Sequence, residues 1–294
     1  MDLRGRSFFG VTELTAWKFA AVNILQILSL FRGKKELHGR IIQKAMKEMY
    51  DGVWVIGNDL LYRVLNAYEE RGFLESSWAE HNEDEDIRSI RYYKITPQGI
   101  NQLHALKNTY LGNAELIIEI LQQSLQIIWG DDKPQAPTSK PKPLSSTVFT
   151  VLNVLNFLYR QTHALPFYGE PKAEITLSDV WFYAKSIQEE LADIYKNKWS
   201  PSDGVLYPQL SKLSTKKILQ TRWTYNGEEG FSKKRTVREY QLTTAGKEYF
   251  LELIAPEAGL KNRIIDLIGF YQKSITFIYG QQAEREKKLK RYIS

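Results

Sequence analysis

The side chains that could do chemistry in this chain are basic and polar, and most of them fall in its second half. Lys212 and Lys216 stand four residues apart, which puts them on one face of a helix. Lysine and arginine bind phosphate oxygens, whereas hydroxyl and amide side chains hydrogen-bond to base edges. The candidates for DNA contact in this half are Ser200, Ser202, Gln209, Lys212, Lys216, Lys233, Lys234, Arg235 and Arg238. The two lysines are also consistent with an ordinary solvated helix face.

The first half holds a smaller set of the same kind. Its candidates are Asn58, Arg63, Asn66, Arg88 and Arg91. Residues 80–86 read EHNEDED, and the five carboxylates of this acidic loop would repel a phosphate backbone. The loop suits a basic protein partner instead, or it occludes a recognition surface. If both halves contact DNA, they therefore do so differently, and the target need not be a palindrome.

The sequence has none of the residue patterns that are typical of an enzyme. The absence of cysteine excludes disulfides, cysteine-ligated zinc, iron–sulfur clusters and cysteine nucleophiles. The histidines, at positions 38, 81, 104 and 163, do not have the spacing of metal ligands. A phosphate-binding glycine loop and a nucleophile elbow are also absent. We therefore expect no catalytic residue, no metal and no cofactor, and for His38 a structural hydrogen bond at the start of a helix.

Composition and charge point to a globular protein with an uneven charge distribution. The 294 residues are 43% hydrophobic and 25% charged, as in soluble chains of about two domains. No apolar run approaches the ~20 residues that span a bilayer, and the N-terminus lacks the apolar core of a signal peptide. We expect a cytoplasmic protein without a membrane partner. Residues 1–130 hold 15 basic and 16 acidic residues, whereas residues 131–294 hold 25 and 18, so the second half is the electropositive one.

A proline-rich stretch separates two copies of one pattern. Residues 131–147 contain four prolines and are typical of an extended linker. On either side, Trp54, Leu61-Tyr62, Leu65, Leu74 and Trp78 recur 145 residues later as Trp199, Leu206-Tyr207, Leu210, Leu219 and Trp223. Residues 93–99 recur with an offset of 147, and residues 128–130 with an offset of 150. Such a slowly growing offset indicates an internal duplication. We predict repeat 1 at 1–130 and repeat 2, with a basic C-terminal tail, at 148–294.

Each repeat is predicted to contain three helices, a β-hairpin and a long final helix. In repeat 1 these are expected at 12–31, 38–49 and from 58, then 73–78 and 89–95, then 97–129. In repeat 2 they are expected at 147–161, 177–195 and from 200, then 218–225 and 236–242, then 244–254 and 260–291 after a break at Pro256. Gly72 favours a left-handed end to the third helix of repeat 1, and Lys217 favours it less in repeat 2. This order is that of a winged helix-turn-helix domain, whose third helix enters the major groove.

Short motifs recur around these predicted elements. Repeat 1 contains Leu37-His38-Gly39, Val53-Trp54, Leu61-Tyr62, Gly72-Phe73-Leu74 and RYYKITPQG at 91–99. Repeat 2 contains Trp199-Ser200-Pro201, Leu206-Tyr207-Pro208 and YQLTTAG at 240–246. In these motifs the chain resembles the PadR family of bacterial transcription regulators. Repeat 1 departs from the family pattern by lacking the Ser-Pro and having Arg63 in place of a proline. Repeat 2 has Leu177-Ser178-Asp179 where the family has Leu-His-Gly.

The resemblance implies a fold and an assembly. The fold would be mainly α with small β-hairpins (α+β), built as tandem winged helix-turn-helix domains with long C-terminal helices. PadR proteins usually carry one such domain and dimerise through the C-terminal helix, so two copies in one chain imply an intrachain pseudo-dimer. The linker permits this, because its 17 residues reach at most ~55–60 Å when extended. Whether pseudo-dimers assemble further is left open.

The resemblance also implies a function. Tyr62 and Tyr207 stand where the family has a tyrosine in its recognition helix, although both also suit a core position. The implied protein is a transcriptional regulator that binds double-stranded DNA sequence-specifically, with repeat 2 as the first place to look for contact. The alternative is a protein-interaction adaptor that no longer binds DNA through one or both repeats.

Overall fold

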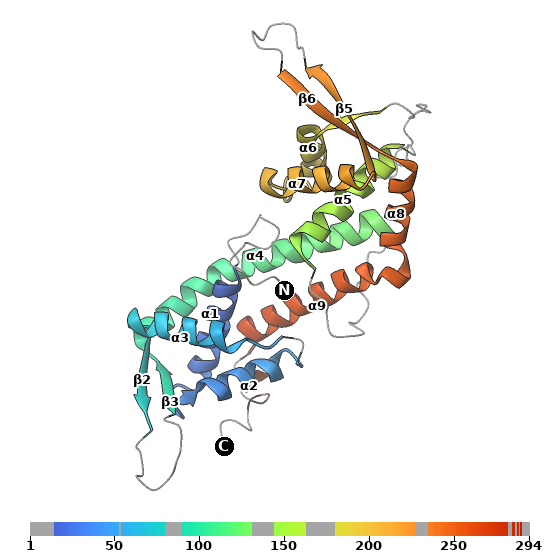
Figure 1. Cartoon of the computed structure of the whole chain (residues 1–294). Helices are drawn as coiled ribbons and strands as arrows, with labels where there is room; N and C mark the ends of the chain where they lie inside the picture. Colours follow the sequence, from blue (N-terminus) through green and yellow to red (C-terminus); the bar gives the residue numbers. More distant parts are fainter. Residues whose placement is uncertain are drawn as a thin grey trace.

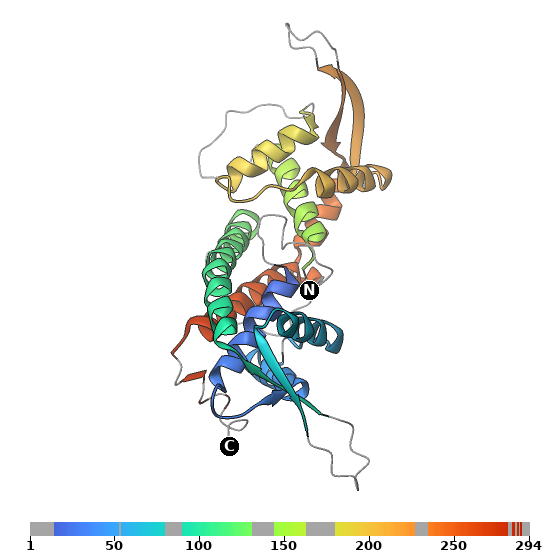
Figure 2. The same cartoon turned by 90° about the vertical axis from the view of Figure 1, so that its left-hand side faces the viewer.

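The computed structural model describes residues 15–52, 54–79, 90–130, 144–162, 180–226 and 235–281, together with 284, 285, 287 and 289. Within these residues the two halves contain the same kinds of element in the same order, and the fold is an α+β pair of tandem winged helix-turn-helix domains. The molecule is elongated, and its two β-hairpins lie at opposite ends (Figures 1 and 2). The duplication is therefore visible in the structure as well as in the sequence.

Repeat 1 is built around helix α1 (Ala16–Leu30), whose apolar side chains are almost all buried. It continues with β1 (Leu37–His38), α2 (Gly39–Met49), α3 (Asn58–Glu70), β2 (Leu74–Trp78), β3 (Arg91–Ile95) and α4 (Pro97–Trp129). The hydroxyl of Thr96 caps α4 by accepting a hydrogen bond from the Gly99 N–H at 3.0 Å. The helices and the hairpin predicted for repeat 1 are confirmed, with small differences at their ends.

Repeat 2 has the same succession, with a break in its last helix. Its elements are α5 (Ser146–Thr162), β4 (Phe182–Tyr183), α6 (Ala184–Ile194), α7 (Asp203–Thr215), β5 (Leu219–Asn226), β6 (Arg235–Leu242), α8 (Thr244–Ile254), η3 (Pro256–Ala258) and α9 (Leu260–Tyr279). The expected break at Pro256 is confirmed. The expected uninterrupted helix from 260 to 291 is wrong, because Gly280 takes an extended backbone conformation and ends α9. Beyond this break, residues 284, 285, 287 and 289 are helical again. Helix α5 begins inside the stretch predicted as linker, most of which lies outside the described residues.

Each hairpin gains a third, two-residue strand that the sequence did not predict. Leu37 pairs with Tyr93 in β3, and Phe182 pairs with Tyr240 in β6. Residues 182–184 are therefore the counterpart of Leu37-His38-Gly39, at the same offset of 145 as the tryptophans. The expected counterpart at 177–179 is wrong. The second helix of repeat 2 begins at Ala184 because the two residues before it belong to the sheet.

The two hairpins also share one register. Strands β2 and β3 pair from Leu74↔Ile95 to Trp78↔Arg91, and β5 and β6 pair in the same way from Leu219↔Leu242 to Trp223↔Arg238. The turn before each hairpin is left-handed, with φ of 73° at Gly72 and 60° at Lys217. Repeat 2 thus keeps the cap although a lysine there lacks the conformational freedom of glycine.

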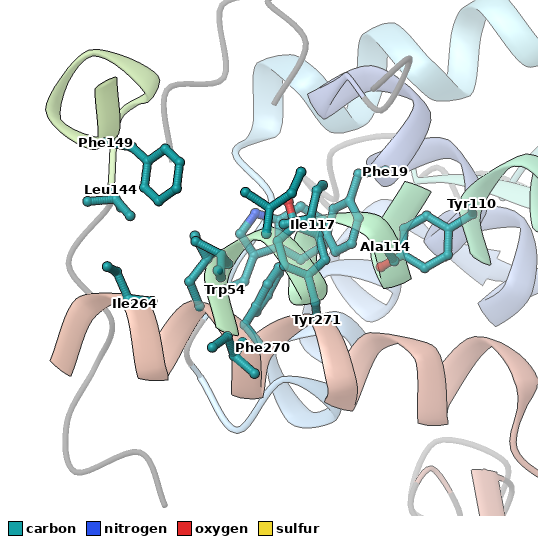
Figure 3. Packing of buried hydrophobic residues seen from close by; sticks show 14 of the residues in the cluster. Phe19, Trp54, Tyr110, Ala114, Ile117, Leu144, Phe149, Ile264, Phe270 and Tyr271 are labelled. Atoms are coloured by element: carbon teal, nitrogen blue, oxygen red, sulfur yellow. The ribbon is translucent and has the colours of Figure 1, made fainter. Parts of the chain in front are cut away.

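One hydrophobic core runs through both repeats. In repeat 1 the ring of Phe19 meets Trp54 edge-on at 4.7 Å and also lies 5.4 Å from Phe270 of α9. In repeat 2 Phe149 meets Trp199 in the same edge-on geometry at 4.9 Å. Figure 3 shows Phe270 and Tyr271 of α9 among the buried side chains of repeat 1. A helix that belongs to repeat 2 in sequence therefore completes the core of repeat 1.

A buried polar cluster fixes α9 against repeat 1. The Tyr50 hydroxyl donates to Asn23 Oδ1 at 2.6 Å and lies 2.9 Å from the Ser274 hydroxyl, with which it shares a hydrogen bond. The hydroxyl of Tyr110 donates to the same serine at 2.6 Å. Burial raises the pKa of both tyrosines, which keeps their hydroxyl protons in place as donors.

The same arrangement is repeated on the other side of the molecule. Tyr195 donates to Asn153 Oδ1, and Ser124 of α4 donates to that oxygen at 3.5 Å. Tyr195 is 145 residues after Tyr50, and Ser274 is 150 residues after Ser124. The long helix of each repeat thus provides a serine to a tyrosine–asparagine pair in the other repeat.

The ends of the two long helices make a second matched pair of contacts. Tyr279 at the end of α9 donates to the Lys107 carbonyl in α4, and Trp129 at the end of α4 donates from its indole N–H to the Ile254 carbonyl in α8 at 3.0 Å. These contacts tie each helix end to the helix that directly follows the hairpin of the other repeat. Among the described helices, none combines the length and the hydropathy needed to span a membrane.

Candidate nucleic-acid interface

Helices α3 and α7 occupy the recognition-helix position of their domains. The side chains of Leu61, Leu65 and Tyr68 are buried on one face of α3, as are Leu206, Leu210 and Leu213 on α7, which leaves the opposite faces exposed. A glutamine of the preceding helix hydrogen-bonds to a backbone carbonyl just before each recognition helix. Gln43 donates to the Ile56 carbonyl at 2.7 Å and Gln188 to the Pro201 carbonyl at 2.6 Å. Both helices therefore present a polar face from a fixed position.

The outer face of α7 combines hydroxyl groups with positive charge. Lys212 and Lys216 are exposed, and Tyr207 is 49% exposed, so this tyrosine is not a core residue. Ser202 is exposed at the N-cap of α7, where its side chain makes no cap hydrogen bond. Ser200 and Gln209 are half-buried at the margin of this face.

Two exposed residues of α7 were missed by sequence reasoning. Ser211 and Thr215 follow Tyr207 at intervals of four residues, so the three side chains form one row along the helix. The sequence signal was the periodicity itself, because the buried leucines fix which positions face outward. Ser211 and Thr215 belong with the lysines in any interface that α7 makes.

The outer face of α3 is largely paired within itself. Arg63 forms an ion pair with Asp59 at 2.8 Å, and Asn58 accepts a hydrogen bond from Gln43 at 3.2 Å. Tyr62 is 42% exposed, and its hydroxyl lies against Gly39, where an added Cβ would approach it to 2.8 Å. Asn66 is exposed. The predicted contact residues of α3 are thus on its exposed face, but Arg63 already has a partner.

The β2–β3 and β5–β6 hairpins are the wings of the two domains. Each wing has an arginine at the same position, and the two arginines have different partners. Arg91 of β3 forms an ion pair with Glu69 at 2.6 Å, and its Nε donates to Ser76 at 2.9 Å. Arg238 of β6 donates to Thr221 at 3.3 Å, and within the described residues it has no ion pair. Both guanidinium groups lie over the tryptophan opposite in the register, at 5.4 Å for Trp78 and 6.0 Å for Trp223.

Several predicted residues lie outside the described part of the chain. These are Arg88, Lys233, Lys234 and the acidic loop at 80–86. Arg235 is described only as the first residue of β6. The exposed tryptophans of the two hairpins, which are 59% exposed at Trp78 and 68% at Trp223, were not among the predicted contacts although their offset marked them as a pair.

Charge is distributed differently over the helices of the two repeats. Residues 58–72 of repeat 1 hold two basic and three acidic residues, whereas the equivalent residues 203–217 of repeat 2 hold three and one. The preceding helix has the opposite bias, because α2 carries three basic residues and one acidic residue, whereas α6 carries one basic and three acidic residues. The more positive recognition helix is therefore α7.

His38 lies beside the basic face of α2. Its side chain makes no cap hydrogen bond, so the expected hydrogen bond at the helix start is wrong, and the ring packs edge-on against Tyr92 at 5.7 Å. Partial burial lowers the pKa of His38, and the positive charges of Arg40, Lys44 and Lys35 lower it further. The histidine thus favours its neutral form in repeat 1, where α2 supplies the positive charge.

Comparison with known proteins identifies a family for this chain. The family model of the transcriptional regulator PadR-like family matches residues 27–105 and 177–252. The two matches run from α1 to α4 in repeat 1 and up to α8 in repeat 2, so both include the recognition helix and the hairpin. No curated protein and no solved structure matches the chain.

Proposed function

From the premise that the chain belongs to the PadR-like family of transcriptional regulators, we propose that it binds double-stranded DNA sequence-specifically as a covalent pseudo-dimer. The two winged helices would take the place of the two subunits of a dimeric regulator, and each recognition helix would face its own half-site. Repeat 1 at 1–130 and repeat 2 at 148–294 would be the two units of this assembly.

The main observation behind this proposal is that the long helix of each repeat packs against the other repeat. Ser274 hydrogen-bonds to Tyr50 and Ser124 hydrogen-bonds to Asn153, so the long helix of each repeat contacts the tyrosine–asparagine pair of the other repeat. Such contacts hold α3 and α7 at one separation and orientation, as dimerisation does in two-chain regulators. A fixed separation is what a regulator needs to read two half-sites together.

Repeat 2 is the copy that we expect to supply most of the binding energy. Phosphate contacts contribute the sequence-independent part of DNA affinity, and α7 has the greater excess of positive charge. Its row of Tyr207, Ser211 and Thr215 offers hydroxyl groups for base edges. Because α3 and α7 have different outer residues, the two half-sites would differ in sequence.

A second candidate function has one specific observation in its favour. Among the described residues of repeat 1, two of its three candidate arginines are paired with carboxylates, Arg63 with Asp59 and Arg91 with Glu69. A surface neutralised in this way suits a protein partner at least as well as a phosphate backbone. In this version repeat 1 is an adaptor, and only repeat 2 binds DNA.

DNA binding is tested by replacing the two exposed lysines of α7. The double variant Lys212→Ala/Lys216→Ala should bind the DNA upstream of its own gene about tenfold or more weakly than the wild type. Each phosphate contact contributes about 0.9 to the slope of log K against log salt, so the slope should fall by nearly 2. Fluorescence anisotropy at several salt concentrations between about 50 and 200 mM measures both quantities.

The matched control is Lys247→Ala on α8, a helix that packs against α5. This variant should bind as the wild type does. Absence of a complex in low salt for the wild-type chain would rule out the DNA-binding proposal. A complex with unchanged affinity in the double variant would remove α7 from the interface.

A further inference from the structure

The inference concerns the arginine at the equivalent position of the two wings, and it rests on the proposed DNA binding. Arg91 and Arg238 occupy the same place in two hairpins of one register, opposite Trp78 and Trp223. Their surroundings differ in charge at one residue of the recognition helix. The position of Glu69 in α3 corresponds to Ser214 in α7, because both helices are related by the offset of 145.

In repeat 1 the guanidinium group of Arg91 is held on several sides. Its Nη2 is 2.6 Å from a carboxylate oxygen of Glu69, and its Nε donates to Ser76, whose own hydroxyl donates to the other Glu69 oxygen at 2.5 Å. The side chains of Arg91 and Glu69 are only 30% and 26% exposed, so water screens this pair less than a surface pair. Charge-assisted contacts of this length are the strong class of hydrogen bond.

In repeat 2 the carboxylate is missing. Ser214 donates its hydroxyl back to the Leu210 carbonyl of its own helix at 2.7 Å and gives Arg238 no counter-charge. The neighbouring Glu239 lies one residue along β6 and forms its ion pair with Arg222 at 2.6 Å. Within the described residues, the Nε of Arg238 is buried and has no hydrogen-bond partner. The guanidinium group of repeat 2 thus keeps a positive charge that no carboxylate of the described residues neutralises.

We propose that Glu69 occupies Arg91 and thereby prevents the wing of repeat 1 from contacting a DNA phosphate, whereas Arg238 makes this contact in repeat 2. A phosphate that approached Arg91 would have to displace a carboxylate that is already in place and would be repelled by it. The residue pair Glu69 and Ser214 therefore contributes to the choice of the wing that binds the backbone, in addition to the acidic loop at 80–86. Part of the difference in phosphate binding between the two repeats therefore depends on a single residue, which can be exchanged by mutation.

The test exchanges the two residues in the full-length chain. Glu69→Ser gives repeat 1 the residue that repeat 2 has at this position, and Ser214→Glu gives repeat 2 the residue of repeat 1. Glu69→Gln removes the charge but keeps the shape of the side chain. The probe is a mixed-sequence DNA duplex of about three helical turns, because phosphate contacts do not depend on sequence. Affinity is measured across about 50 to 200 mM salt, and thermal unfolding confirms that each variant is folded.

Both Glu69 variants should bind more tightly than the wild type, with a slope steeper by about 0.9, which corresponds to a further loss of roughly threefold in affinity across that salt range. Ser214→Glu should weaken binding and flatten the slope by a similar amount. The control is Glu70→Gln, which removes the same charge from the next, exposed position of α3 and should have a smaller effect with an unchanged slope.

The outcomes separate this inference from the proposed function. Wild-type binding with an unchanged slope in Glu69→Gln overturns the inference and leaves DNA binding intact. An equal effect of Glu70→Gln also overturns it, because the change would then reflect overall charge. Failure of the wild-type chain to bind the duplex at any salt concentration overturns the inference together with the proposed function.

Discussion

Replacing Gly99 by alanine is expected to destabilise the protein by about 3 kcal/mol or more, although the change adds a single methyl group. A Cβ at this position would lie 2.1 Å from the Phe73 carbonyl oxygen and 2.8 Å from the Ile95 side chain. The start of α4 cannot move away easily, because the Thr96 hydroxyl caps Gly99 and also donates to that same Phe73 carbonyl at 3.1 Å. The clash must therefore break the contact between helix and hairpin. Urea unfolding followed by circular dichroism measures the loss.

The matched control lies in the same helix. Gly112 is exposed in the middle of α4, and an added Cβ there would meet nothing within 4 Å. Gly112→Ala should therefore stabilise the protein by about 0.5–1 kcal/mol, because alanine loses less backbone entropy in a helix. The two variants carry the same substitution and should have effects of opposite sign. A cost below about 1 kcal/mol for Gly99→Ala would show that α4 can shift, and that the close approach is not required.

Gly99 also shows what the sequence could reveal of this fold. It recurs as Gly246, where a Cβ would lie 2.2 Å from the Ile218 carbonyl, so the repeated motif marks a repeated close approach. The offsets of the tryptophans and leucines predicted the duplication. Motifs of this kind are local, since they record how one helix or hairpin meets its neighbour.

The missed features depend on contacts between distant residues. Strands β1 and β4 are two residues long and have no alternation to detect, so they appear only when β3 and β6 are placed beside them. The ion pair of Arg91 with Glu69 joins residues 22 apart on a strand and a helix, and neither position alone predicts it. For this reason Arg91 was a candidate for DNA contact from its type, and only the structure gave it another partner.

The second large effect is expected where the repeats share one core. Phe270 belongs to repeat 2 in sequence, but its ring lies 5.4 Å from Phe19 and 5.1 Å from Tyr50 of repeat 1. Phe270→Ala should destabilise the protein by about 3–5 kcal/mol, the usual cost of a phenylalanine deleted from a packed core. Because the cavity opens between the repeats, both should lose stability in one cooperative transition. Urea unfolding gives the free energy, and hydrogen–deuterium exchange shows where protection is lost.

The control for this variant is Leu251→Ala on α8, which also removes a large apolar side chain from repeat 2. Leu251 is 47% exposed, so its loss should change the free energy of unfolding by no more than about 0.5 kcal/mol. In Phe270→Ala, exchange should increase in α1 to α3 of repeat 1 as much as in α9. An increase confined to α9, or two separate unfolding transitions, would contradict the shared core. The repeats would then be independent domains, and the fixed separation of α3 and α7 on which the pseudo-dimer depends would lose its physical basis.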